Sequence, residues 1–259
     1  MSTSSSADRA PKAAGGFRPG LFENREVLVT GGTSGIGAAI VEAFLALGAS
    51  VLATGVIGAE IEAATRVPAL KGARFVKLDV RDGEAVRAIV GAPPRLDHVV
   101  NCAGVIRRGQ ELSPEGFADV VDINLNGSMR VCAAARPRLA EARGTIVNMA
   151  SMLSFFGSAA APGYSASKGG VAQLTKSLAI AYAGDGIRVN AVAPGWIATP
   201  LTQALRDDPA RNAEIAGRTA MKRWGEPSEV ASGALFLSSP MASFVTGAVL
   251  VIDGGYLIT

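Results

Sequence analysis

Seven short apolar segments alternate with helical stretches along the chain, and this alternation limits the possible fold more than any other feature. Each segment is a nearly continuous apolar run of strand length, without the polar alternation of a strand that faces water. Such strands, separated by helices, form a parallel sheet covered by helices on both faces. We therefore expect an α/β protein with one doubly wound parallel sheet. The expected strands are 26–30, 50–55, 74–80, 96–104, 144–151, 187–195 and 248–255.

The composition excludes several classes of function. Charged residues make up 18% of the 259 residues and the formal net charge is +3, with no long basic run, so we expect no nucleic-acid partner. No apolar run is long enough to span a membrane, and residues 1–20 lack the apolar core of a secretory signal, which favours a cytoplasmic protein. Two cysteines and one histidine, His98, are too few for a disulfide framework or a zinc site, so we expect no metal and an ordinary structural role for His98.

A glycine-rich turn joins the first expected strand to the first expected helix. The sequence "TGGTSGIG" covers 30–37. Glycines at such a turn let the backbone approach a pyrophosphate, and the N-terminus of the helix supplies free N–H groups for the anion. The turn therefore predicts a Rossmann-type dinucleotide site, although a plain strand-to-helix turn would have a similar composition. The expected contacts to the coenzyme are Gly31, Thr33, Ser34, Gly35, Ile36 and Gly37.

The choice between NAD and NADP depends on the end of the second strand. An acid that binds the ribose is expected there, near Gly55, but the sequence "VLATGVIG" has neither an acid nor the cation that a 2′-phosphate would need. The coenzyme is thus NAD or NADP, and we lean to NAD.

Tyr164 and Lys168 lie four residues apart in "YSASK", with only small residues between them. In a helix, positions i and i+4 share one face, so both side chains can act on the same small volume.

With these motifs, the chain resembles the short-chain dehydrogenase/reductase family over nearly its whole length after the first 20 residues. The matching features follow the order of the family's pattern, with Ser151 placed 13 residues before Tyr164. They are Thr30-Gly31 with Gly35 and Gly37, Asp79, "NCAG" at 101–104, Asn124, Ser151, "YSASK", Pro194-Gly195 and "DGG" near the end.

The resemblance implies roles for four catalytic residues. Tyr164 would be the acid/base, and a nearby lysine with the oxidised nicotinamide would lower its pKa from the usual value of about 10. Lys168 would also bind the nicotinamide ribose. Ser151 would hold the reacting oxygen, and Asn124 would position a water that links Lys168 to solvent. Taken singly, each has a structural alternative, such as a helix cap for Ser151 or a satisfied buried amide for Asn124.

The family's pattern also implies further coenzyme contacts. Asp79 and Val80 would bind the adenine, and Asn101, Ala103 and Gly104 would line the groove for the adenosine. Pro194 and Gly195 form a turn after which Ile197 and Thr199 would hold the carboxamide. The chain departs from the family at Cys102, where a second Asn is usual. We expect Cys102 to be a packed small residue.

The substrate is less constrained by the sequence. "AGVIRRG" and "SMLSFFG" resemble family members that oxidise sugars and sugar acids, such as deoxygluconate and gluconate dehydrogenases. Arg107 or Arg108 would then pair with a substrate carboxylate. Alternatively, Met152, Phe156 and Trp196 suit a bulky apolar ketone, as in a 3-oxoacyl-carrier-protein reductase. A third hypothesis is a dinucleotide-binding sensor without catalysis, although such a protein has no need of the proton relay.

The resemblance also sets expectations for organisation and assembly. We expect a flexible N-terminal tail at 1–20 and a single dinucleotide-binding catalytic domain at 21–259. The segment at about 196–222 is long for a connection and is expected to form a mobile lid over the substrate. Family members usually form homotetramers, so a homotetramer or a homodimer is expected.

Overall fold

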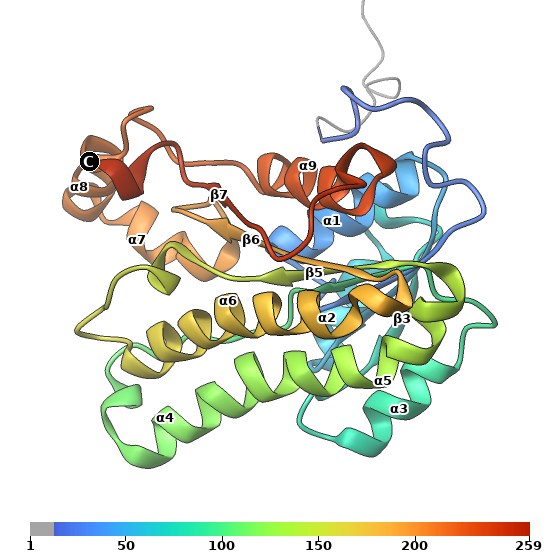
Figure 1. Cartoon of the computed structure of the whole chain (residues 1–259). Helices are drawn as coiled ribbons and strands as arrows, with labels where there is room; N and C mark the ends of the chain where they lie inside the picture. Colours follow the sequence, from blue (N-terminus) through green and yellow to red (C-terminus); the bar gives the residue numbers. More distant parts are fainter. Residues whose placement is uncertain (1–12) are drawn as a thin grey trace, which may run out of the picture.

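A computed structural model describes residues 13–259, and its centre is one seven-stranded parallel sheet (Figure 1). The strand order is β3-β2-β1-β4-β5-β6-β7. All seven predicted strands are present, and several are shorter than expected at their ends. Their bounds are β1 Glu26–Thr30, β2 Ser50–Gly55, β3 Arg74–Lys77, β4 His98–Asn101, β5 Thr145–Met149, β6 Arg188–Pro194 and β7 Val249–Ile252. The predicted doubly wound α/β fold is confirmed.

Burial is greatest in the centre of the sheet. Every residue of β4 and β5 is buried, whereas most of β3 is exposed and β7 is mainly half-buried. The apolar runs therefore do not lead to full burial in β3 and β7. Each is an edge strand with a neighbour on one side only, and β3 begins and ends with a cation.

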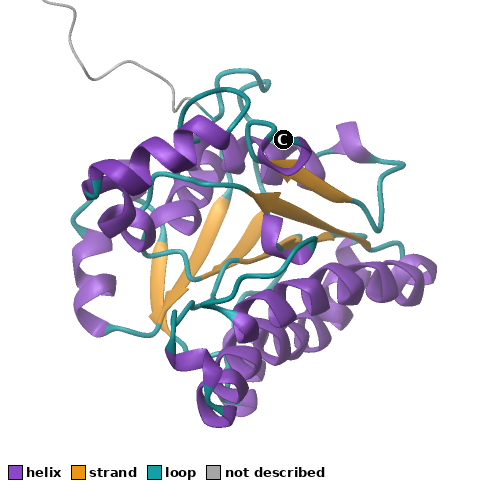
Figure 2. Ribbon diagram, turned by 90° about the vertical axis from the view of Figure 1, so that its left-hand side faces the viewer, coloured by secondary structure: helices purple, strands orange, loops and turns teal. Residues whose placement is uncertain are grey.

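Helices cover both faces of the sheet (Figure 2). Residues of β1 alternate between the faces, so that Val27 and Val29 pack with one layer of helices and Leu28 packs with the other. The first layer holds α1 (Gly35–Ala46), α2 (Gly58–Thr65) and α9 (Pro227–Ser238). The second layer holds α3 (Gly83–Gly91), α4 (Pro114–Val121), α5 (Gly127–Ala142) and α6 (Pro162–Tyr182).

The helical stretch from Pro114 to Ala142 is interrupted. A π-helical turn at Asp122–Asn126 separates α4 from α5 and contains Asn124. A turn of this type inside a helix is frequent at functional sites because it changes the direction of nearby side chains. After β6, the segment expected to form a lid contains α7 (Gln203–Asp207) and α8 (Pro209–Arg218).

Part of the expected tail belongs to the packed domain. Ala13 and Ala14 are buried in the core beside α1 and α9, and the Ser232 hydroxyl donates a hydrogen bond to the carbonyl of Ala13 at 3.3 Å. The expected tail therefore does not include Ala13 and Ala14, since these small side chains fit between packed elements. Residues 1–12 lie outside the described residues.

The sheet also determines where a ligand can bind. β1 pairs with β2 on one side and with β4 on the other, so the chain crosses over in opposite directions from this point. Loops diverge there and leave a crevice at the carboxyl ends of the strands. Between residues 13 and 259, none of the helices combines the length and the apolar character needed to cross a membrane.

Candidate active site

A cavity of about 560 Å³ lies at the carboxyl ends of the central strands. It is lined by the loop after β1, by the segments that follow β2, β3 and β4, by the start of α6 and by residues after β6. Thirteen of the residues predicted to contact a coenzyme meet there: Gly31, Thr33, Ser34, Gly35, Ile36, Gly37, Asp79, Val80, Ala103, Gly104, Tyr164, Lys168 and Thr199.

The glycine turn brings the start of α1 close to the ends of β1 and β4. Gly31 has a φ of +65°, and a Cβ there would lie 2.8 Å from the backbone of Ala103. A Cβ on Gly37 would overlap the carbonyl oxygen of Gly31. The Ser34 side chain does not cap α1, so the N–H groups of the first turn are available to an anion. This cradle fits the pyrophosphate of a dinucleotide.

Asn101 does not line the cavity, and this expectation is wrong. Its side chain is buried between β4 and β5, where its amide nitrogen donates to Asn148 Oδ1 at 2.9 Å and lies 3.3 Å from Cys132 Sγ. Side chains alternate along a strand, so Asn101 points into the core while the backbone beyond it turns toward the cavity. The next residue, Cys102, does line the cavity, and burial raises the pKa of its thiol to about 12.

Three further residues that were predicted to contact the coenzyme do not line the cavity: Pro194, Gly195 and Ile197. Pro194 ends β6, and a Cβ on Gly195 would lie 2.6 Å from that of Asp253, so the small residue permits this close packing. Ile197 is buried and bridges to Gly225.

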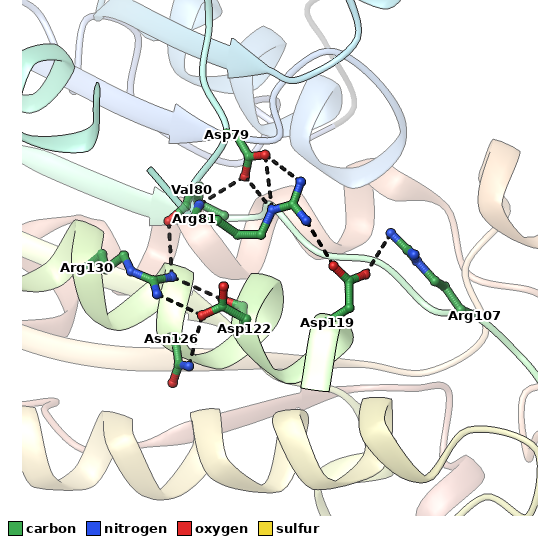
Figure 3. A network of polar contacts seen from close by, with 8 residues as sticks. All are labelled: Asp79, Val80, Arg81, Arg107, Asp119, Asp122, Asn126 and Arg130. Atoms are coloured by element: carbon green, nitrogen blue, oxygen red, sulfur yellow. Dashed lines mark hydrogen bonds and ion pairs between the residues drawn. The ribbon is translucent and has the colours of Figure 1, made fainter. Parts of the chain in front are cut away.

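The part of the cavity formed after β3 holds a network of charges (Figure 3). The Arg81 guanidinium donates to both oxygens of Asp79 at 2.6–3.1 Å and to Asp119 at 2.9 Å. These hydrogen bonds hold the pKa of Asp79 below its usual range. Asp79, the carboxylate expected to bind adenine, is thus already paired with Arg81, two residues further along the chain. The family's motif did not predict this pair.

An acid also lines the cavity beyond β2. The sequence has no carboxylate at Gly55, but Glu60 in the first turn of α2 reaches the cavity wall. The expected spacing did not identify Glu60, because α2 starts only after the irregular segment Val56-Ile57. The acid therefore lies five residues after Gly55, the position where it was expected.

Tyr164 and Lys168 lie on one face of α6, as predicted. The Lys168 ammonium is 5.5 Å from the centre of the Tyr164 ring and donates to the carbonyl of Met149 at 2.6 Å. Lys168 is buried, and desolvation lowers its pKa to about 8. It remains mostly protonated at neutral pH.

Burial raises the pKa of Tyr164, and the lowering by Lys168 together with an oxidised nicotinamide stays a prediction. A hydrogen bond from Ser151 and the charge of Arg108 act in the opposite direction, and the charge of Glu111 adds to the increase. Desolvation outweighs the cations of the protein because the phenolate would be the charged form. A positively charged ring beside Tyr164 would favour the phenolate.

Ser151 follows β5 and serves two purposes. Its hydroxyl accepts a hydrogen bond from the amide of Leu153 at 3.1 Å, which caps a short helical turn at Met152–Ser154. The same hydroxyl contacts Tyr164. The capping alternative and the catalytic placement are therefore compatible.

Asn124 is a fully bonded amide that holds the loop after β4. Its side chain accepts from the amide of Val105 at 2.8 Å, donates to the carbonyl of Val105 at 2.9 Å, and donates to Ser167 Oγ at 3.1 Å. Its backbone carbonyl accepts from Ser128. The water that would link Asn124 to Lys168 stays a prediction.

The two arginines after Val105 differ in their surroundings. Arg107 lines the cavity but pairs with Asp119 of α4 at 2.8 Å, which also binds Arg81 (Figure 3). Arg108 has no ion-pair partner within residues 13–259, and its charge acts on Tyr164. Of the two, Arg107 lines the cavity and is paired, whereas Arg108 lies outside the cavity lining.

Aromatic residues from three distant segments contact one another, and none of them lines the cavity. Phe156 stacks on Tyr256 at 6.3 Å between ring centres, and Trp196 meets Tyr256 edge-on at 6.3 Å. Arg218 of α8 lies 4.3 Å from the Tyr256 ring. Met152 is also buried, and it lies in the short helical turn that Ser151 caps. Tyr256 and Arg218 were not predicted, because only the fold brings the C-terminus against α8.

Twelve cavity-lining residues were not among the predicted contacts. Most are apolar or backbone contacts next to predicted residues, so strand ends were the one signal that could have identified them. They are Gly55, Val56, Ile57, Glu60, Leu78, Arg81, Cys102, Val105, Ile123, Met149, Pro200 and Leu201.

Comparison with known proteins gives a consistent family. Residues 31–257 match the family model described as Enoyl-(Acyl carrier protein) reductase. A 2-dehydro-3-deoxy-D-gluconate 5-dehydrogenase of Pseudoalteromonas atlantica is 37% identical, with 91% of this chain and 97% of the relative covered. A galactitol 2-dehydrogenase (L-tagatose-forming) of Cereibacter sphaeroides is 41% identical, with 89% and 94% covered.

Two other matches bear on substrate and coenzyme. A 3-oxoacyl-(acyl-carrier-protein) reductase of Thermotoga maritima is 37% identical, with 92% of this chain and 99% of the relative covered. A structure from Agrobacterium tumefaciens with bound NADP, described as a candidate 2-deoxy-D-gluconate 3-dehydrogenase, superposes with a TM-score of 0.84 at 38% identity and covers 94% of this chain and 100% of its own. Overall identity therefore does not separate these substrates.

Proposed function

The chain belongs to the short-chain dehydrogenase/reductase family, and from that premise we propose that it oxidises a secondary alcohol of a sugar or sugar acid with NAD⁺. It is an NAD(P)-dependent oxidoreductase. The observation that carries the proposal is that Tyr164 and Lys168 lie together at a cavity whose other wall is a glycine cradle, with Ser151 acting on the Tyr164 phenol. Sugar and sugar-acid dehydrogenases among the relatives support the substrate class.

The chain's own residues supply the proton chemistry. A bound nicotinamide coenzyme accepts or returns the hydride. Tyr164 takes the proton from the substrate alcohol, or gives it back to the carbonyl, while Ser151 orients the same oxygen. Lys168 donates to the coenzyme's ribose and stabilises the phenolate, and Asn124 completes the path for the proton. Held 2.8–2.9 Å from Val105, Asn124 also keeps the loop beside the substrate in place.

For the coenzyme, the charges along the cavity favour NAD⁺. A 2′-phosphate would need a cation near the end of β2, where Glu60 lies instead. Arg81, a cation of the cavity wall, is already shared between Asp79 and Asp119.

For the substrate, we assign Arg108 as the partner of a carboxylate. Arg107 is held by Asp119, whereas Arg108 is exposed and acts on Tyr164. A guanidinium binds a carboxylate with two parallel hydrogen bonds, which would fix a sugar acid beside the acid/base. An acyl thioester has no such carboxylate at its reacting end, so this cation favours the sugar acid over the carrier-protein substrate.

We also propose that the enzyme assembles as a homotetramer or homodimer. Apolar side chains remain exposed at the β7 edge and on α6, including Val251 at 38% and Ile180 at 82% exposure. A second copy covering them would remove apolar surface from water. Light scattering after size exclusion measures the assembly directly.

The experiment that tests the proposed function is a turnover screen of the purified protein. Sugars, sugar acids and polyols are offered with NAD⁺ or NADP⁺, and an acetoacetyl thioester with the reduced coenzymes, while reduced nicotinamide is followed by its absorbance. We expect turnover of a sugar or sugar acid that is lost in Tyr164→Phe. Turnover of the thioester alone would make the protein a carrier-protein reductase. Tight coenzyme binding without any turnover would support the sensor hypothesis.

A further inference from the structure

One buried carboxylate beside the site has no part in the chemistry described above. Glu111 lies in a short helical turn at Gln110–Leu112, and only 1% of the residue is exposed. Its Oε1 accepts a hydrogen bond from the amide of Arg107 at 2.6 Å, and its Oε2 accepts one from the amide of Tyr164 at 2.7 Å. A buried charge is costly unless it is hydrogen-bonded, so both bonds matter to the fold around it.

The bond to Tyr164 completes the start of α6. The first turn of a helix has N–H groups without partners, and the residue before α6, Ala161, has no side chain that can cap them. Pro162 has no N–H, so the third residue, Tyr164, presents an amide that needs an acceptor. Glu111 supplies it from another element, and its negative charge at a helix N-terminus is favourable.

Gly163 makes room for this contact. A Cβ at Gly163 would lie 3.3 Å from Glu111 Oε2 and 3.2 Å from the Cα of Phe117. The glycine therefore allows the carboxylate and α4 to approach the backbone of the catalytic helix closely.

The bond to Arg107 holds the other wall of the site. The loop after β4 is fixed at Val105 by Asn124 and at Arg107 by Glu111. The Glu111 carboxylate thus connects two backbone segments. One is the loop that carries Arg108, and the other is the start of α6 at Tyr164.

We propose that Glu111 is a positioning residue that sets the distance between the acid/base Tyr164 and the substrate-binding loop at 105–109. The proposal rests on the proposed function only in assigning Tyr164 as the acid/base. Loss of the Glu111 charge should also change the pKa of Tyr164 in a definite direction. The groups that act on the Tyr164 phenol are Ser151, Lys168 and Arg108, together with Glu111, whose charge raises the pKa of Tyr164.

The test compares Glu111→Gln with Glu115→Gln, which removes the same charge from an exposed position in the first turn of α4. In Glu111→Gln one carboxylate oxygen is replaced by an NH₂ group that cannot accept a hydrogen bond. We expect kcat to fall about 10- to 100-fold, as small misplacements of reacting groups do, and the rise of kcat with pH to move to lower pH. Glu115→Gln should match the wild type in both.

Glu111→Asp separates position from charge. It keeps the negative charge but is one methylene too short to bond both amides, so we expect a lowered kcat with a pH profile close to that of the wild type. Wild-type kcat in both Glu111 variants would overturn the proposal, and so would an unshifted pH profile in Glu111→Gln.

Two measurements do not depend on a substrate, and the first of them needs no variant. Hydrogen exchange of the wild-type protein should show a protected Tyr164 amide, although the third N–H of a helix normally exchanges fast; fast exchange would overturn the proposal. Ultraviolet titration of the phenols, with Tyr164→Phe as the reference, reports ionisation of Tyr164 directly. A protein that turns over no substrate but passes both tests would refute the proposed function and leave the role of Glu111 intact.

Discussion

Gly37→Ala is the substitution that tests the coenzyme cradle most directly. A Cβ at this position would overlap the carbonyl oxygen of Gly31 and lie 2.9 Å from the carbonyl carbon. Carbon and oxygen atoms in contact are about 3.3 Å apart or more, so the turn or the start of α1 must move by about 1 Å. Both groups are backbone, and neither can rotate away as a flexible side chain would.

The size of the effect follows from that displacement. Overpacking of this kind costs about 1–3 kcal/mol, which lowers Tm by roughly 2–10 °C in a protein of this size. Hydrogen bonds to a charged group are worth about 1.5–3 kcal/mol each, so misdirecting one amide donor weakens coenzyme binding about 10- to 100-fold.

Calorimetric titration with NAD⁺ measures the Kd, and thermal unfolding without coenzyme measures Tm. The matched control is Gly58→Ala at the start of α2, where a Cβ would meet nothing within 4 Å. The control should keep the wild-type Kd and a Tm that is unchanged or slightly higher, since alanine favours helix. A Gly37→Ala protein with wild-type Kd and Tm would show that the close approach of α1 to Gly31 is not what forms the binding site.

Three further predictions concern charges. Arg108→Ala should raise KM for a sugar acid about 10- to 100-fold, the loss expected for a charge-assisted pair, and leave KM for a neutral polyol unchanged. Arg107→Ala should change KM much less. Equal effects of the two substitutions would refute the assignment of Arg108 as the partner of the carboxylate. Glu60→Gln should raise kcat/KM for NADP⁺ about three- to tenfold relative to NAD⁺, because it removes roughly 1 kcal/mol of repulsion between the Glu60 carboxylate and the 2′-phosphate. An unchanged ratio would show that the 2′-phosphate does not lie near Glu60. His98 is buried neutral with a pKa lowered by desolvation from 6.5 to about 3. Because the unfolded chain then binds the extra proton, the free energy of unfolding should fall by up to about 1.4 kcal/mol per pH unit below pH 6.5, and denaturant titrations of His98→Asn should show a flatter decline.

Much of the fold follows from local patterns. Continuous apolar runs specify buried strands, helical periodicity specifies the segments between them, and the right-handed crossover leaves few ways to connect parallel strands. The glycine turn and the i, i+4 spacing of Tyr164 and Lys168 are local as well, so their placement at one cavity could be expected from the sequence.

The sequence by itself determined the sheet, the coenzyme cradle and the face shared by Tyr164 and Lys168, because neighbours along the chain define each of them. Contacts between distant segments were decided only by the tertiary structure. Asp119 holds Arg107 from α4, Arg81 occupies Asp79, and Tyr256 reaches Phe156 from the C-terminus. Glu111 bonds Tyr164 across 53 positions. A charged or aromatic side chain has many equally suitable partners in a sequence, and only the packed fold selects the one within bonding distance.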